Sequence, residues 1–207
     1  MLLTSLNLLS AFVLFAFVSS ITPGPNNTML LASGVNFGVR RTIPHALGVS
    51  IGFMVMVLGV GLGLGEVFKV YPLAYTVLRY AGAAYLLYLA WKIANSGPMS
   101  ASDPQSRKPL GFWGAAAFQW VNPKAWVMAV GAITTYTPAQ GYLFNVIVIS
   151  AVFCLVNLPS VCVWVMFGSA LRRFLQDPRW LRRFNLLMAA LLVLSLYPLL
   201  FVESGFF

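Results

Sequence analysis

Charged side chains are scarce in this sequence, and acidic ones are the scarcest. Of its 207 residues, 8% are charged and only four are acidic, whereas 60% are hydrophobic. A soluble domain carries about 25% charged residues, because polar side chains must cover its surface. The mean hydropathy of +0.85 agrees with this shortage. The composition therefore excludes an ordinary soluble domain and predicts a membrane protein whose partner is the lipid bilayer.

Side chains for catalysis and metal binding are also rare. One histidine, two cysteines and four acids leave no Ser-His-Asp set and no cluster of metal ligands. We therefore expect no enzyme, no metal and no cofactor. Cys154 and Cys162 are eight residues apart in one apolar segment. On a helix they would lie about 12 Å apart, too far for a disulfide.

The net charge of +9 comes from residues between the apolar runs. A nucleic-acid groove needs basic residues clustered with aromatic platforms, so we expect no nucleic-acid partner. Three alternate connectors hold ten of the 13 basic residues, namely Arg40, Arg41, Lys92, Arg107, Lys108, Arg172, Arg173, Arg179, Arg182 and Arg183. By the positive-inside rule these connectors are cytoplasmic, which places both termini in the periplasm.

The apolar runs predict an all-α polytopic protein of six transmembrane helices in a single domain, residues 1–207. A span needs about 20 predominantly apolar residues. The candidates are 2–21 (or 12–36), 43–65, 71–93, 112–136, 143–168 and 184–202. Signal peptides begin with positive charge, and no Lys or Arg precedes Arg40. We therefore expect the first span to be retained.

The two halves of the chain repeat one pattern at an offset of 100 residues, which aligns Pro23 with Pro123. The halves, about 1–96 and 110–207, flank a polar connector at about 95–110. Since each half has an odd number of predicted spans, the halves should have opposite orientations, as in many secondary transporters. The repeat favours 12–36 as the first span, with Pro23 near its centre.

Each half should contain a broken helix. Pro23, Gly24 and Pro25 are incompatible with a regular helix, and Pro123 should interrupt the span 112–136. Broken backbone at membrane depth is tolerated only where it is buried or lines a cavity, and a matching pair of breaks indicates a substrate site. The alternative is a turn at the membrane surface in the first half and a mere kink in the second.

Lys124 is the most informative single residue, because a lysine at mid-membrane costs about 2.5–3.5 kcal/mol. It could bind a substrate carboxylate or release a proton, or it could reach an interface as a purely structural residue. His45 is a second candidate for proton coupling. The other candidate substrate ligands also have structural alternatives. The amides at the breaks could instead cap half-helices; they are Asn26, Asn27, Gln119 and Asn122. Asn157 could instead form an interhelical hydrogen bond.

Three segments, 22–27 (TPGPNN), 81–92 (AGAAYLLYLAWK) and 118–124 (FQWVNPK), resemble the LysE/RhtB family of amino-acid exporters, closest to the cysteine/O-acetylserine exporters. The resemblance implies proton-coupled export of small neutral amino acids across the bacterial inner membrane. Homoserine, threonine, leucine or basic amino acids are alternative substrates. The family's motif residues correspond to Pro23, Gly24, Pro25, Asn26, Asn122, Pro123 and Lys124.

Two functions of other classes remain open. A transmembrane thiol-transfer protein would need cysteines on two facing helices, whereas both cysteines here lie in one predicted span. A channel would conduct without saturation. Gly48 and Gly52, four residues apart, predict close helix packing, which is also compatible with a homodimer.

Overall fold

The computed structural model describes residues 6–64, 70–96 and 108–197. Within these ranges every element is a helix. They are α1 (Leu6–Ile21), α2 (Pro25–Phe37), α3 (Val39–Gly59) with its π-helical continuation η2 (Val60–Leu64), α5 (Pro72–Ala94), α6 (Phe112–Gln119), α7 (Pro123–Tyr136), α8 (Tyr142–Leu171) and α9 (Pro178–Leu194).

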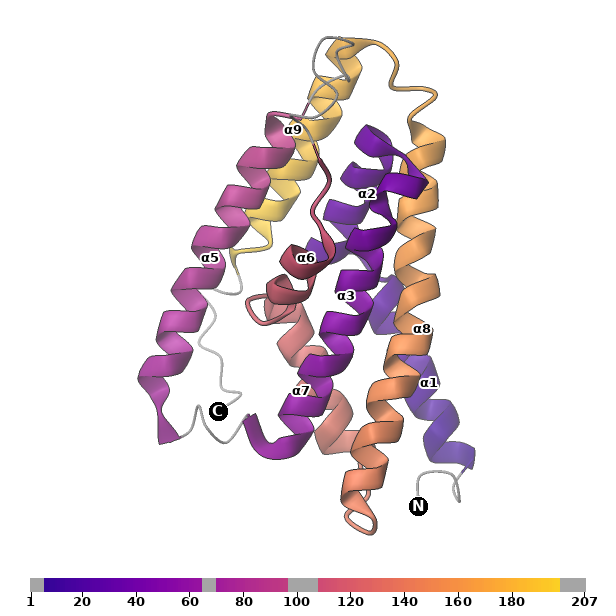
Figure 1. Cartoon of the computed structure of the whole chain (residues 1–207), viewed down its shortest axis with the longest axis vertical. Coiled ribbons are helices and arrows are strands. Elements are labelled where there is room, and N and C mark those ends of the chain that lie inside the picture. The colour runs from indigo at the N-terminus through magenta and orange to yellow at the C-terminus, as the bar shows by residue number, and fades with distance from the viewer. Residues whose placement is uncertain (1–5, 65–69, 97–107, 198–207) are drawn as a thin grey trace.

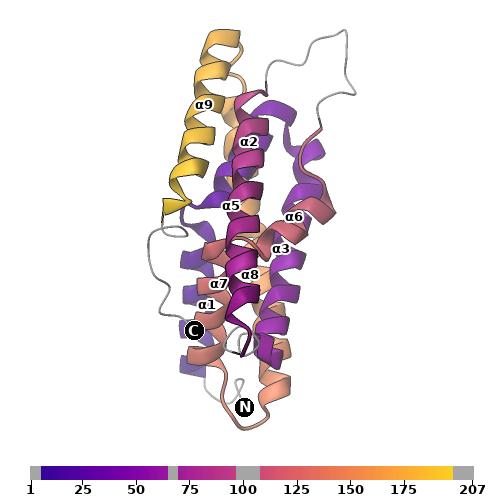
Figure 2. The same ribbon diagram turned by 90° about the vertical axis from the view of Figure 1, so that its left-hand side faces the viewer.

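The helices form an elongated bundle whose members run along its long axis (Figures 1 and 2). In Figure 1, α1 and α2 run upward, α3 returns downward and α5 runs upward again. The later elements follow the same order in the opposite sense: α6 and α7 run downward, α8 upward and α9 downward. We call the end where α2, α5 and α8 finish the upper end.

The apolar helices fit a bilayer. Val39–Leu64 and Tyr142–Leu171 are long and apolar enough to cross a membrane. The pair Leu6–Ile21 and Pro25–Phe37, bent by 54°, is a third span if it counts as one. The six-span arrangement remains a prediction.

Both expected interruptions are present. The first predicted span breaks between Ile21 and Pro25, and the fourth between Gln119 and Pro123. In each case a proline occupies the first turn of the second half-helix, α2 or α7. This position suits proline, because its missing N–H would have no partner there.

Glycines bring α2 and α8 into backbone contact. A Cβ atom at Gly34 would collide with the Val165 carbonyl oxygen, and one at Gly168 would collide with the Leu31 carbonyl oxygen. Small residues allow such close approach, and within lipid the close packing itself stabilises the helix pair.

The predicted close packing at Gly48 and Gly52 is confirmed, because α3 crosses α6 there. A Cβ atom at Gly48 would collide with the Phe112 carbonyl oxygen, and one at Gly52 would lie 2.5 Å from the Ala116 Cα. The crossing holds α6 at mid-height in the bundle (Figure 1).

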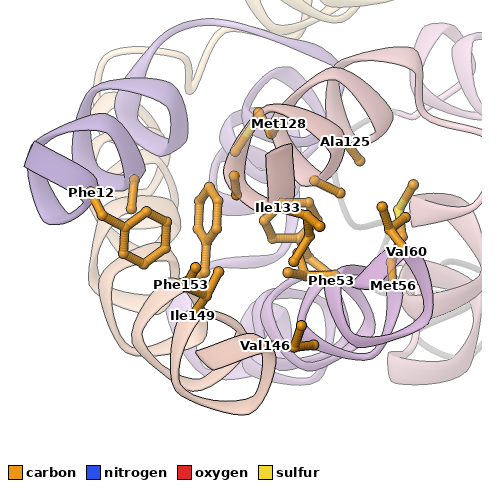
Figure 3. Packing of buried hydrophobic residues seen from close by; sticks show 14 residues of the cluster. Phe12, Phe53, Met56, Val60, Ala125, Met128, Ile133, Val146, Ile149 and Phe153 are labelled. Atoms are coloured by element: carbon orange, nitrogen blue, oxygen red, sulfur yellow. The ribbon is translucent and has the colours of Figure 1, made fainter. Parts of the chain in front are cut away.

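The largest apolar cluster fills the space among α1, α3, α7 and α8. Figure 3 shows the Phe153 ring between those of Phe12 and Phe53, with centroid separations of 5.5 Å and 4.8 Å and edge-on geometry. Such edge-to-face pairs add to the packing energy. We call this the lower cluster; its buried members are Phe12, Ala16, Phe53, Met56, Val57, Val60, Ala125, Met128, Ala129, Ala132, Ile133, Val146, Ile149 and Phe153.

Candidate functional site

The two helix breaks face each other across a pocket in the middle of the bundle. We call it the central pocket; it encloses about 330 Å³, open mouth included. Its lining comes from both broken helices and from α3 and α8: Ser19, Ser20, Gly24, Asn26, Asn27, Phe53, Gln119, Asn122, Lys124, Ala125, Met128, Asn157 and Val161.

The break between α1 and α2 is held together by side chains. The end of a helix leaves carbonyl oxygens without helical partners, and within lipid the protein itself must satisfy them. The Asn27 amide donates to the Ser20 oxygen at 2.8 Å and to the Thr22 oxygen at 2.7 Å. The Trp164 indole donates to the Ile21 oxygen at 3.0 Å. Three successive carbonyl oxygens at the C-terminal end of α1, those of Ser20, Ile21 and Thr22, thus have side-chain donors.

Lys124 completes this set of contacts from the other broken helix. Its Nζ donates to the Thr22 carbonyl oxygen at 2.8 Å, to the Thr22 Oγ1 at 2.9 Å and to the Pro23 oxygen at 3.1 Å. A cation at a helix C-terminus is favoured by the helix dipole. Gly24 makes room for it, since a Cβ atom there would lie 2.8 Å from the lysine Cδ. Lys124 therefore fastens one break to the other.

The second break has its own cap. Asn122 Oδ1 accepts the backbone N–H of Lys124 at 3.1 Å, and Pro123 opens the first turn of α7. The cap directs the N-terminal end of α7 to the pocket, because both Asn122 and Lys124 line it. The helix dipole is therefore positive on the side of α7 that faces the pocket.

A reciprocal amide pair joins α2 to α6. Asn26 Nδ2 donates to Gln119 Oε1 at 2.8 Å, and Gln119 Nε2 donates back to Asn26 Oδ1 at 3.1 Å. Gln119 is fully buried and also donates to the Ala115 oxygen of its own helix at 2.9 Å. The pair bridges the two halves of the chain at the pocket wall.

A second polar link passes through Asn157 in the middle of α8. Its Oδ1 accepts from Ser50 Oγ at 2.9 Å, and its Nδ2 donates to Ser20 Oγ at 3.1 Å. The link therefore joins α8 to α3 and α1. The sequence singled out Asn157 but neither serine, because a lone serine in an apolar helix gives no local signal of its partner.

Most of the predicted site residues gather at the central pocket. Gly24, Asn26, Asn27, Gln119, Asn122, Lys124 and Asn157 line it. The prolines Pro23, Pro25 and Pro123 shape the helix ends beside it. His45 lies outside it, near the start of α3. The lining residues that sequence analysis missed are Ser19, Ser20, Phe53, Ala125, Met128 and Val161.

The pocket combines one cation with neutral polar groups and an apolar wall. None of the described residues that line it is an acid or a cysteine, and Cys154 and Cys162 are both free thiols in α8. Among the residues that the structure describes, no group of His, Cys, Asp or Glu could hold a metal ion. Such a pocket suits a small solute with a carboxylate and a short side chain.

Comparisons with known proteins agree with this chemistry. Residues 17–197 match the model of the LysE type translocator family. Cysteine/O-acetylserine efflux proteins of Escherichia coli strain K12 and Shigella sonnei strain Ss046 are each 33% identical over 190 residues, covering 90% of this chain and 94% of theirs. No solved structure matches significantly. Because the family match spans nearly the whole chain, the protein belongs to the LysE type translocator family.

Proposed function

We propose that this protein is a secondary transporter that exports small neutral amino acids or their derivatives, of the cysteine/O-acetylserine kind, by proton antiport. The observation that carries the proposal is the polar central pocket, built where both helix breaks meet. Support for the substrate class comes from the efflux proteins that share 33% of their residues with this chain. Other amino acids, such as homoserine, threonine, leucine or basic ones, are the alternative substrates.

The proposed architecture is six spans in two inverted three-helix halves, about 1–96 and 110–207, in one domain. The opposite courses of α1–α5 and α6–α9 support this arrangement (Figure 1). The described basic residues at the ends of α5 and α8 and at the starts of α3 and α9 lie toward the upper end. We therefore place the upper end and the connector at about 95–110 in the cytoplasm, and both termini in the periplasm.

Substrate binding would exchange one set of hydrogen bonds for another. All three N–H donors of Lys124 have acceptors in the break, at Thr22 and Pro23. A substrate carboxylate, drawn by the N-terminal ends of α2 and α7, would accept hydrogen bonds from the Lys124 amino group in place of these oxygens. The Thr22 and Pro23 carbonyl oxygens, no longer bonded to Lys124, would then accept hydrogen bonds from the substrate's ammonium group. The exchange satisfies both charged groups and loosens the contact between the two halves.

Alternating access would move one half against the other around this site. The lower cluster shares Phe53, Ala125 and Met128 with the pocket and continues below it with buried residues such as Ile149 and Phe153. In this conformation the cluster blocks a path to the lower end. Loosening the Lys124 contact would allow α1 and α7 to separate and open that path.

Proton coupling would depend on basic groups. Asp177 is the one acid among the described residues, and it caps α9 by accepting the Arg179 N–H at 2.8 Å. Lys124 is therefore the proposed proton carrier in the pocket, and His45 is a second candidate outside it. For antiport, the lysine would take up a proton from the periplasm when the amino acid leaves and release it to the cytoplasm when the next amino acid binds.

The test is the efflux of labelled cysteine, O-acetylserine, leucine, threonine, homoserine and lysine from bacteria that overproduce the protein, with and without a protonophore. Selective, saturable efflux of cysteine and O-acetylserine that the protonophore abolishes is the expected result. Efflux of another amino acid would change the substrate class, and non-saturating flux would indicate a channel. Membrane insertion without efflux of any of them would contradict the proposal. A Cys154→Ser/Cys162→Ser variant should remain active. That result would exclude thiol transfer.

A further inference from the structure

A second pocket lies at the upper end, among the last turns of α2 and α5 and the start of α3. We call it the upper pocket; it encloses about 420 Å³, open mouth included. Its lining divides into a polar part, containing His45, Lys92 and Lys108, and an apolar part, containing Met29 and Leu89.

His45 is the unusual member of this lining. Only 2% of its surface is exposed, and neither Nδ1 nor Nε2 has a hydrogen-bond partner among the described residues. A neutral imidazole offers one donor and one acceptor, and burying both without partners costs free energy. A buried polar group in this state needs an explanation, and a bound ligand that supplies the partners is one.

The charges around His45 indicate which ligand would fit. Lys92 and Lys108 line the same pocket, and none of the described residues that line it is acidic. The nearby polar groups are held in place, because Asn36 and Asn185 exchange amide hydrogen bonds at 2.8 Å and 3.1 Å. The pocket therefore favours a ligand with a carboxylate. A second polar group of that ligand can form a hydrogen bond with the neutral His45 ring.

One face of α2 leads from this pocket to the central one. Asn26 lines the central pocket, whereas Met29, Ser33 and Asn36 line the upper pocket. Their spacings of three and four residues put all four side chains on one face of the helix. Asn26 and Asn36 are about 15 Å apart along the axis. The same helix face could therefore guide a solute between the two pockets.

We propose that the upper pocket is a first binding site for the transported amino acid. Lys92 and Lys108 bind its carboxylate, and a ring nitrogen of His45 accepts a hydrogen bond from its ammonium group. Met29 and Leu89 contact its short side chain. The inference rests on the proposed export function, which makes the upper end the side of substrate entry. The central pocket then receives the amino acid along α2.

The single histidine of the chain makes the test direct. Protein labelled with ¹⁵N-histidine and reconstituted in lipid should give the imidazole signals of His45 alone. Titration with L-cysteine or O-acetyl-L-serine should shift these signals saturably. Cysteamine, which lacks the carboxylate, should need at least about a tenfold higher concentration, since a hydrogen bond to a charged group is lost.

Variants separate the upper pocket from the central one. Lys92→Met should raise the half-saturating concentration at least about tenfold, whereas Lys124→Met should leave the His45 response intact. Arg182→Gln, which removes an exposed charge at the same end, is the matched control and should change nothing. His45→Leu should raise the KM of efflux, because the upper pocket loses a ligand of the amino acid.

Each negative result has a distinct meaning. Efflux without any His45 response, or an equal response to cysteamine, would overturn the upper pocket as an amino-acid site. A Lys92→Met protein with wild-type affinity would do the same. A saturable response in a protein that exports none of the tested amino acids would uphold the site and contradict the transport function instead.

Discussion

Lys124 joins the two helix breaks and is also the proposed ligand of the substrate carboxylate. We expect Lys124→Met to lower efflux at least about tenfold, because the transferable hydrogen-bond donors are lost. The same change removes the contacts to Thr22 and Pro23 and should lower the thermal unfolding temperature. Efflux assays and thermal unfolding of the purified protein measure the two effects separately.

Lys124→Arg is the matched control for these two roles. A guanidinium keeps the charge and the donors but does not release its proton. We expect this variant to retain most of the stability of the wild-type protein and to lose the coupling of efflux to the proton gradient. Wild-type efflux by Lys124→Met would contradict the proposed site. Full proton coupling in Lys124→Arg would exclude the lysine as proton carrier.

Gly24 determines where the Lys124 side chain can lie. A Cβ atom there would be 2.8 Å from Lys124 Cδ and 3.3 Å from Nζ, so Gly24→Ala should shift the ammonium from its acceptors and reduce efflux severalfold. Gly111→Ala is the control, since a Cβ atom at Gly111 meets nothing within 4 Å. Equal efflux by both variants would indicate that the lysine position is unimportant.

The contact between α2 and α6 depends on the amide pair of Asn26 and Gln119. A double-mutant cycle with Asn26→Ala and Gln119→Ala should give a coupling energy of about 0.5–1.5 kcal/mol in the free energy of unfolding, because either single change already breaks both bonds. Pairing Asn26→Ala with Asn185→Ala, whose contacts lie at the upper end, should give additive effects. Additivity in the first cycle would mean that the pair contributes nothing to joining the halves.

Local chemistry explains why the helix breaks were predictable from the sequence. Proline removes a helical N–H donor and crowds the preceding turn, so Pro23, Pro25 and Pro123 pointed to both interruptions. A proline alone is not decisive, because α3 and α8 continue through Pro44 and Pro159. The partners of Lys124 could not be derived in this way. The Thr22 and Pro23 oxygens become acceptors only because the helix ends there and packing brings α7 alongside, at a separation of about a hundred residues.

The same reasoning separates the predicted pocket residues from the missed ones. An amide or a lysine inside an apolar run is conspicuous, because burying it requires a partner. Phe53, Met128 and Val161 are ordinary members of an apolar helix, and only the packing of α3, α7 and α8 turns them toward the pocket. The upper pocket was missed as a site for a similar reason: His45 was noted, but its lysine neighbours come from other segments.

The molecule as a whole combines a basic upper end, a polar central pocket and an apolar lower cluster. This order is what an exporter needs if the upper end faces the cytoplasm. In the proposed mechanism, the basic residues would retain the upper end on that side and the two pockets would supply successive sites for a zwitterion. The lower cluster would block the exit until the halves move. The proposed direction of transport therefore depends on orientation in the membrane.

Two glutamines at opposite ends of the bundle can test that orientation. Gln140, between α7 and α8, and Gln176, between α8 and α9, are both exposed. In a protein without its own cysteines (Cys154→Ser and Cys162→Ser), a membrane-impermeant thiol reagent added to intact cells should label Gln140→Cys and not Gln176→Cys. After permeabilisation both should react, which confirms that each thiol is accessible. The reverse pattern would place the basic end in the periplasm and would make the upper pocket an exit rather than an entry site.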